Sequence, residues 1–279
     1  MKKIIAAFDG LKFSDSTKEF AVNIAQQTNA HLVGVFLEDL TYHSYKIYEL
    51  ITEKGVSESK LKQYEASDTE AREKAVKKFE TACQVAGINY SVHHDRKIAI
   101  KELLHESIYA DLLVIDSKET LTHYDETKPT RFIRELLAEV QCPVLLVPQK
   151  YKSIDKIMLL YDGEPSAVFA IRMFSYVLPE LKELPCEVVS VKYMNSSLHV
   201  PDNKLIKEFM KRHFPKATYT TLKGIPEIEI VSHLKEQKEN TLIALGAYRR
   251  SLVSRWFRTS MADVLMKEFK MPLFIAHNK

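Results

Sequence analysis

The chain of 279 residues repeats itself. Residues 3–10, KIIAAFDG, return as residues 156–163, KIMLLYDG. Each half also ends in a short apolar segment that begins with proline, at 143–147 and at 272–276. A repeat of this length predicts two copies of one folding unit, each of a size common for a single domain. We therefore predict one domain at 1–149 and a second at 154–279.

Short apolar segments alternate with segments of helical periodicity in both halves. The predicted strands are 3–8, 31–37, 88–92, 111–115 and 143–147, then 156–161, 187–193, 217–221, 241–245 and 272–276. The main predicted helices are 15–28, 68–86, 98–109, 130–140 and 261–269. This alternation is typical of a parallel sheet that helices cover on both faces. We predict an α/β fold with two tandem doubly wound domains, each a five-stranded parallel sheet.

Composition and charge restrict the class of protein. Hydrophobic residues make up 46% and charged residues 28%, as in soluble globular proteins. The 40 basic and 37 acidic residues leave a net charge of +3, which is too small to indicate a nucleic-acid partner. No apolar run is long enough to cross a bilayer, and Asp9 interrupts the basic N-terminus too early for a signal peptide. We expect a cytoplasmic protein without a membrane or nucleic-acid partner.

The residues that most often bind metals are not spaced for that role. Cys83, Cys142 and Cys186 are odd in number and lack metal-type spacing, which favours buried, reduced thiols. His93 and His94 are neighbours on a predicted strand, so their side chains point to opposite faces of the sheet. We therefore expect no metal site in the protein itself.

Candidate ligand-binding residues follow the first and fourth strand of each half. A doubly wound sheet binds its ligand beyond the carboxyl ends of its strands, where the strand order reverses. Asp162 and Gly246 should face one such crevice, and Asp9 and Asp116 should face the other. An Asp-Gly pair after a strand is also a common turn, so a structural role for Asp162 stays open.

The segment after strand 241–245 combines features that favour an anion. Gly246 provides a tight exit, and Thr259 or Ser260 can cap the helix that follows. A helix N-terminus near cationic side chains is a suitable site for phosphate. The intervening loop is rich in arginine, with Arg249, Arg250, Arg255 and Arg258. A solvated loop or an interface between the halves is the alternative interpretation, in which Trp256 is packed rather than stacked on a base.

Residues 38–67 have no counterpart in the second half. They carry four tyrosines, Tyr42, Tyr45, Tyr48 and Tyr64. A variable surface insertion, a lid and a dimer contact are the three interpretations of this segment.

In its strands and in the segments that follow them, the chain resembles the universal stress protein family, in a tandem form that covers nearly all of its length. The resemblance rests on the two Asp-Gly pairs, on the five-strand alternation and on the Cys-Pro-Val ending at 142–144. In the nucleotide-binding branch, strand four is followed by glycine, two residues, glycine, nine residues, glycine and then serine or threonine. The second half places Gly246, Arg249, Thr259 and Ser260 at these positions, and the first half places Asp116, Glu119, Pro129 and Thr130 there.

The resemblance implies a Rossmann-like domain with strand order 3-2-1-4-5 and an ATP site, with Mg²⁺, in the second half alone. A side chain in place of a phosphate-binding glycine blocks the close approach of the backbone or must replace it, and Arg249 could replace it. In the first half Asp116 would face the phosphates and repel them. The implied site residues are Asp162, Val191, Gly246, Arg249, Thr259 and Ser260, with weaker first-half equivalents Asp9, Val35 and Thr130.

The sequence contains no recognisable catalytic motif. It has no G-x-S-x-G elbow and no GxxxxGK[ST] loop, and no nucleophile with a partner base is evident. We predict a stress-response protein that acts by binding, with the two domains paired as an internal pseudo-dimer through their last strands. A homodimer and a further protein partner stay open. The alternatives are an interaction scaffold whose arginine loop binds an acidic partner, and a weak ATPase.

Overall fold

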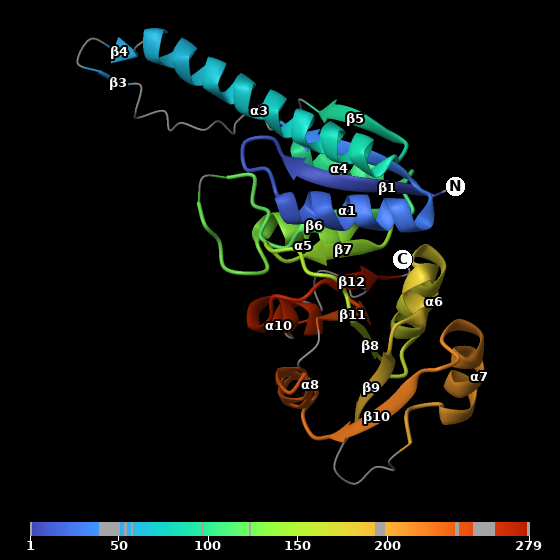
Figure 1. The fold of residues 1–279 in the computed structure, drawn as a ribbon. Coiled ribbons are helices and arrows are strands. Elements are labelled where there is room, and N and C mark those ends of the chain that lie inside the picture. Colours follow the sequence, from blue (N-terminus) through green and yellow to red (C-terminus); the bar gives the residue numbers. More distant parts are fainter. Residues whose placement is uncertain are drawn as a thin grey trace.

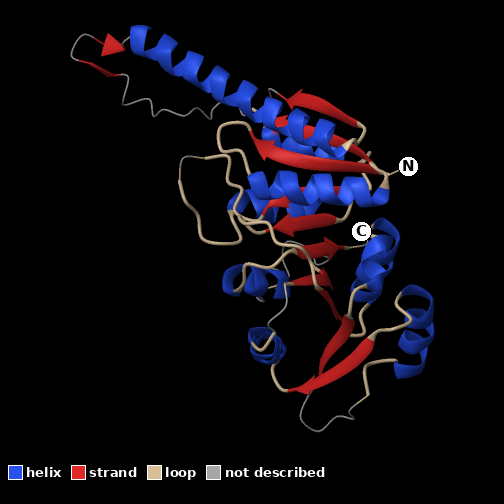
Figure 2. Cartoon of the chain, in the orientation of Figure 1, coloured by secondary structure: helices blue, strands red, loops and turns tan. Residues whose placement is uncertain are grey.

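A computed structural model of the chain describes residues 2–38, 51–52, 55–56, 58–95, 98–122, 124–192, 199–237, 240–247 and 260–277. Helices and strands alternate through both halves, as Figures 1 and 2 show. The first half contains β1 (Lys3–Asp9), α1 (Asp15–Thr28), β2 (His31–Leu37), β3 (Ile51–Thr52), β4 (Gly55–Val56), α3 (Glu58–Ala86), β5 (Tyr90–Asp95), α4 (Ala99–Ser107), β6 (Leu112–Asp116), α5 (Arg131–Glu139) and β7 (Val144–Val147).

The second half follows the same order without the insertion. It contains β8 (Lys156–Leu160), α6 (Pro165–Val177), the 3-10 helix η1 (Pro179–Glu183), β9 (Cys186–Lys192), α7 (Asn203–His213), β10 (Thr218–Lys223), α8 (Pro226–Lys235), β11 (Thr241–Gly246), α10 (Met261–Glu268) and β12 (Leu273–Ala276). Ten of the strands form one sheet, and β3 and β4 form a separate hairpin.

The ten-stranded sheet has the order β10-β9-β8-β11-β12-β7-β6-β1-β2-β5. Neighbouring strands are parallel within each half. At the junction β12 and β7 are antiparallel, with Phe274 opposite Leu145. The predicted α/β fold with a mostly parallel sheet is therefore present, but as one continuous sheet rather than as two separate ones.

Helices cover both faces of the sheet and bury two apolar layers. One layer joins the strands to α1, α3, α6 and α7, and includes Phe20, Phe79 and Phe174. The other joins them to α4, α5, α8 and α10, and includes Leu103, Leu136 and Leu265. Strands with both faces covered are apolar along their whole length, which explains segments such as LLVID and TLIALG.

The helix α3 differs from the prediction. It begins at Glu58, ten residues before the predicted start at 68, and its first turns extend away from the sheet (Figure 1). Side chains 58–60 are exposed, so no apolar face marks these turns in the sequence. Tyr42, Tyr45 and Tyr48 lie outside the described residues.

Besides the strand pair, the start of the chain and α1 contact the second half and the segment that precedes it. The Nζ atom of Lys2 donates a hydrogen bond of 2.6 Å to the carbonyl oxygen of Val177, at the end of α6. The ring of Phe20 on α1 meets the ring of Tyr151 edge-on, with centroids 4.7 Å apart. Separately, none of the helices in the described ranges has the length and apolar character to span a bilayer.

Candidate functional site

The predicted first-half crevice corresponds to the carboxyl ends of β1 and β6, where both aspartates form hydrogen bonds within the protein. Asp9 is 1% exposed and accepts a 2.8 Å hydrogen bond from the backbone N–H of Leu11. Asp116 accepts one of 3.0 Å from the hydroxyl of Ser14, which also caps α1. The connection before α1 is thus tied across the crevice to the end of β6.

A third carboxyl group makes this crevice acidic. Glu119 is buried, and its Oε1 atom accepts hydrogen bonds from the backbone N–H groups of Thr120 and Leu121. Burial, together with the negative charge of Asp9, raises the pKa of Glu119 to about 7. A crevice in which a carboxyl group is already difficult to ionise is a poor place for a triphosphate.

Aromatic and basic side chains cover the neighbouring strand ends. The ring of Phe13 stacks on Phe8 of β1 with centroids 4.8 Å apart, and lies nearly parallel to Phe36 of β2 at 6.4 Å. Arg72 of α3 crosses Gly10, where an added Cβ would lie 3.0 Å from its Cγ atom. The place above β1 and β2 is therefore filled by the protein's own side chains.

The predicted first-half residues Val35 and Thr130 have structural partners. Val35 is fully buried in β2, between Ala7 of β1 and His93 of β5. Thr130 caps α5: its Oγ1 atom accepts a bond from the N–H of Ile133 at 3.2 Å and donates one to the carbonyl oxygen of Glu119 at 2.5 Å. The hydroxyl of Thr130 is thus used within the fold.

In the second half, the aspartate at the strand end and the connection that follows it differ from those of the first half. Asp162 is exposed and accepts a 3.0 Å bond from the N–H of Glu164. The helix α6 begins at the third residue after Asp162, whereas α1 begins at the sixth residue after Asp9. The shorter connection brings the first turn of α6 directly over the end of the sheet.

Gly246 is required by this close approach. A Cβ built on Gly246 would lie 2.5 Å from both the carbonyl carbon and the carbonyl oxygen of Ser166, and 2.8 Å from the nitrogen of Ala167. Real Cβ atoms do not approach backbone so closely, so any side chain here would displace α6. The glycine that the sequence suggested for phosphate thus has a packing role against α6.

Ser260 caps α10, as predicted, but in a different way from Thr130. Its backbone is extended, with φ −68° and ψ 144°, and its side chain makes no capping hydrogen bond. Among the described residues no partner of its hydroxyl is found. The predicted residues Arg249 and Thr259, with Arg250, Arg255, Arg258 and Trp256, lie outside the described residues.

The register shows that Val191 is not the counterpart of Val35. Ala7 pairs with Val35, and Leu160, which has the same place in the repeat, pairs with Val189. Val191 lies two residues further along β9, where it pairs with Leu222 of β10 and is partly buried. The main chain of Val191 is therefore closer to the carboxyl end of the sheet than that of Val35.

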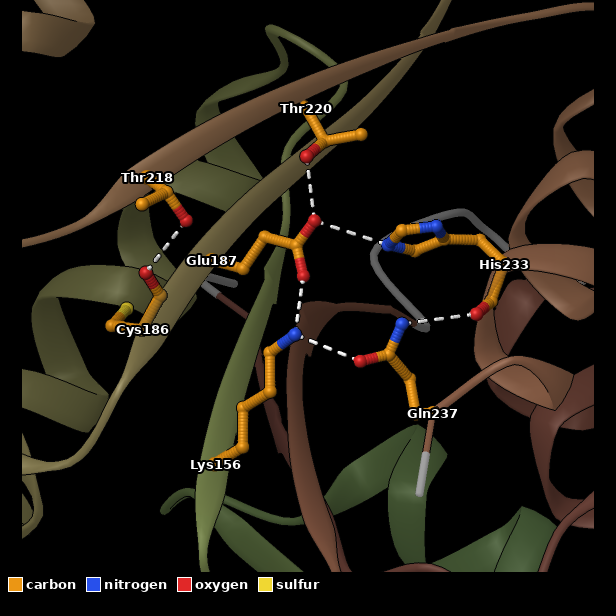
Figure 3. Close-up of polar contacts among 7 residues, drawn as sticks. All are labelled: Lys156, Cys186, Glu187, Thr218, Thr220, His233 and Gln237. Atoms are coloured by element: carbon orange, nitrogen blue, oxygen red, sulfur yellow. Dashed lines mark hydrogen bonds and ion pairs between the residues drawn. The ribbon is translucent and has the colours of Figure 1, made fainter. Parts of the chain in front are cut away.

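A polar cluster around the buried Glu187, which the sequence did not reveal, lies near the amino ends of β8, β9 and β10 (Figure 3). The carboxylate of Glu187 accepts hydrogen bonds from Lys156 at 2.7 Å, Thr220 at 2.5 Å and His233 at 3.1 Å. Lys156 also donates to Gln237 at 2.8 Å. Burial acts to raise the pKa of Glu187, but the bonds from Lys156 and Thr220 hold it below its usual value.

The first half has a related cluster in which the glutamate lies on the helix and the histidine on the strand. Glu106 of α4 binds Lys3 at 3.1 Å and His93 of β5 at 2.7 Å. In the second half the strand carries the glutamate and the helix α8 carries the histidine. These clusters join a helix to the sheet on the side away from the crevices, so we assign them to stability. Within the described ranges no group of three or more His, Cys, Asp or Glu side chains could hold a metal ion.

Comparison with known proteins points to one family. The chain is 22% identical over 287 residues to a universal stress protein of Synechocystis sp. (strain ATCC 27184 / PCC 6803 / Kazusa), covering 98% of this chain and 99% of that one. No family model matches the chain. The fold resembles that of a universal stress protein from Archaeoglobus fulgidus DSM 4304, with a TM-score of 0.70, 12% identity and coverage of 99% and 96% of the two chains.

A second solved structure agrees with the first. A putative universal stress protein from Pseudomonas aeruginosa UCBPP-PA14 has a TM-score of 0.60 and 13% identity, covering 99% of this chain and 92% of its own. At such low identity the solved structures show a shared fold. The sequence similarity, which spans both chains almost completely, and this shared fold confirm that the chain resembles the universal stress proteins from end to end.

Proposed function

We propose that this chain is a cytoplasmic stress-response protein of two universal stress protein-like domains, 1–149 and 154–279, which pair internally through β7 and β12. The second domain binds an adenine nucleotide, ATP with Mg²⁺, and the protein acts by binding rather than by catalysis. The resemblance in sequence and fold supports the family part of this proposal. The nucleotide part rests on how the two crevices differ.

The observation that carries the proposal is the contrast between Ser260 and Thr130. Both residues cap the helix that follows strand four of their half. Thr130 uses its hydroxyl for two hydrogen bonds within the fold, whereas the hydroxyl of Ser260 has no partner in the described part of the chain. An anion at the start of α10 would meet this hydroxyl and the first N–H groups of the helix.

The remaining residues of the proposed site surround the nucleotide from other directions. Arg249 and the main chain of Thr259 would bind the phosphates together with Ser260. The exposed carboxylate of Asp162 would accept a hydrogen bond from the ribose, and the main chain near Val191 would contact the base. These assignments follow the resemblance and require the loop 248–259 to bring Arg249 to α10.

The first half is proposed as a domain without a nucleotide. Asp116 and the buried Glu119 place negative charge where the phosphates would lie. Phe13 and Arg72 fill the space where the nucleoside would lie. Both features would have to be displaced before this crevice could open.

Calorimetric titration with ATP and Mg²⁺ tests the proposal. One nucleotide should bind per chain. Ser260→Ala should weaken binding about tenfold, because one hydrogen bond to a charged group is lost. Arg249→Glu should abolish binding, while Asp116→Gly should leave it within about twofold. Absence of heat and of a thermal shift at millimolar ATP would contradict the proposal, as would two sites per chain.

A further inference from the structure

We propose that the outer surface of helices α6 and α7 binds the headgroups of an anionic membrane surface. Figure 1 shows α7 beside α6 on the outer side of the second half. We call this surface the α6–α7 face, and it consists of Arg172, Tyr176, Lys204, Leu205, Lys211 and Arg212. This inference does not depend on nucleotide binding, because the α6–α7 face shares no residue with the proposed nucleotide site.

The face carries cations that have no counter-ion. The sequence of α7, NKLIKEFMKRH, has four basic residues and one acidic residue, Glu208. Lys204, Lys211 and Arg212 are exposed, and in the described part of the chain none of them forms an ion pair. Basic residues in the last turn favour a helix C-terminus, but Lys204 lies in the first turn, so this effect does not account for the whole set.

Arg172 of α6 extends the positive charge across to the neighbouring helix. Its side chain is exposed, and its guanidinium carbon lies 5.8 Å from the centre of the Phe209 ring of α7. Burial lowers the pKa of His213 in the same helix pair, and the positive charges of Lys182 and Arg172 lower it further. Positive potential is therefore concentrated where α6 meets α7.

Apolar side chains project from among these cations. Leu205 is 66% exposed and Tyr176 is 57% exposed. The Tyr176 ring is 5.4 Å from the ring of His213, which fixes it beside α7. Exposed apolar residues that are surrounded by basic ones are typical of surfaces that lie on a membrane, where the apolar tips enter the headgroup layer and the cations bind anionic lipids.

The first half provides an internal comparison. The helices α1 and α3 cover the same face of the sheet there as α6 and α7 do in the second half. Some of their cations form ion pairs with neighbouring acids: Lys18 contacts Asp15 and Glu19 at 3.1 Å each, and Lys74 contacts Glu70 at 2.6 Å. The small net charge of the chain, from which we expected no nucleic-acid partner, thus conceals a local excess on one helix pair.

The shape of the face favours a lipid surface over a peptide. A peptide is usually held in a groove or along a free strand, where several of its side chains are buried together. The α6–α7 face instead presents the outward side of two helices, with single apolar side chains separated by charges. A layer of mobile headgroups can adapt to such a surface, and each cation adds to the attraction.

Co-sedimentation of the intact chain with vesicles tests this inference. Binding is measured on vesicles of phosphatidylcholine with 30% phosphatidylglycerol, and on phosphatidylcholine alone. We expect binding to the anionic vesicles and at least about tenfold less to the neutral ones. Lys211→Glu with Arg212→Glu should weaken anionic binding by at least about tenfold, and Leu205→Ser should weaken it severalfold at unchanged charge.

A matched control uses the first half. Lys74→Glu with Lys77→Glu makes the same change in net charge on the exposed side of α3 and should leave vesicle binding within about twofold. Circular dichroism and thermal unfolding establish that each variant is folded. The inference is overturned if the wild-type chain binds neither vesicle type, or if the control pair weakens binding as much as the α7 pair. It is also overturned if an acidic peptide or single-stranded DNA binds to the α6–α7 face while vesicles do not.

Discussion

Gly246 and Ser166 touch through their backbones: a Cβ added to Gly246 would lie 2.5 Å from the carbonyl carbon of Ser166. Because the obstacle is the main chain of a helix rather than a flexible side chain, Gly246→Ala must displace the first turn of α6. We expect a loss of about 1–3 kcal/mol in the free energy of unfolding, measured by urea denaturation. Nucleotide binding in the second half should weaken in parallel, because Asp162 directly precedes this turn.

Gly10→Ala is the matched control for that substitution. The atom that a Cβ at Gly10 would meet first is the Cγ of Arg72, at 3.0 Å, and a flexible side chain can move aside. The loss should therefore stay below about 1 kcal/mol. Equal losses at the two glycines would refute the packing role that we assign to Gly246.

The two helix caps should respond differently to removal of their hydroxyl groups. Thr130→Ala removes the cap of α5 and leaves the buried carbonyl of Glu119 without its donor, which should cost about 2 kcal/mol of stability. Ser260→Ala removes no capping bond and should cost less than about 0.5 kcal/mol. Urea denaturation measures the free energy of unfolding of both variants. A large loss in Ser260→Ala would show that this hydroxyl already has a structural partner.

Glu119 should make stability depend on pH near neutrality. Its pKa is raised from 4.5 to about 7 in the folded state, so the protonated carboxyl stabilises the fold below pH 4.5. That contribution is lost as the pH rises through 7, and amounts to at most about 3 kcal/mol. Glu119→Gln should remove this part of the pH dependence and make the protein more stable than wild type at pH 8. Unfolding curves that run parallel for the two proteins from pH 5 to 8 would contradict this expectation.

Removing one charge of the Lys156–Glu187 pair should destabilise the protein more than removing both. Glu187→Gln leaves the partly buried ammonium group of Lys156 without its counter-ion and should cost about 2 kcal/mol at pH 7. Because the pKa of Glu187 is lowered, the contribution of the carboxylate is present above pH 4.5 and is lost as the pH falls through the folded-state value.

Two further variants test whether unpaired charge causes the instability of Glu187→Gln. Lys156→Met combined with Glu187→Leu removes both charges and should recover at least half of the loss. Glu106→Gln in the first half should cost about 1 kcal/mol, because its side chain and that of Lys3 are more exposed, at 19% and 30%. If the double variant is as unstable as Glu187→Gln, unpaired charge is not the cause.

The sequence was sufficient to predict the alternation of strands and helices, because buried parallel strands are apolar throughout and the repeat supplied each pattern twice. It could not predict the early start of α3, since residues 58–67 lack the apolar face that marks a packed helix. We predicted that the last strands of the two halves pair, but the sequence could not show that β7 and β12 extend one sheet across the join, because each strand is apolar whichever partner it has.

The structure shows physical roles for several candidate-site residues that the sequence did not reveal. Asp9 and Asp162 have the same place in the repeat, yet one is buried and the other exposed, because the connections that follow them differ in length. Gly246 met the spacing expected of a phosphate loop, whereas its neighbour is Ser166, 80 positions earlier. The Glu187 cluster joins residues of four elements, and no local pattern in the sequence could indicate it.

The antiparallel pair of β7 and β12 has a consequence for anything that this protein binds. All strands of one half run against those of the other, so their carboxyl ends emerge at opposite borders of the molecule. Groups bound at the carboxyl ends of the strands of the two halves would therefore lie at opposite borders of the sheet and would not overlap.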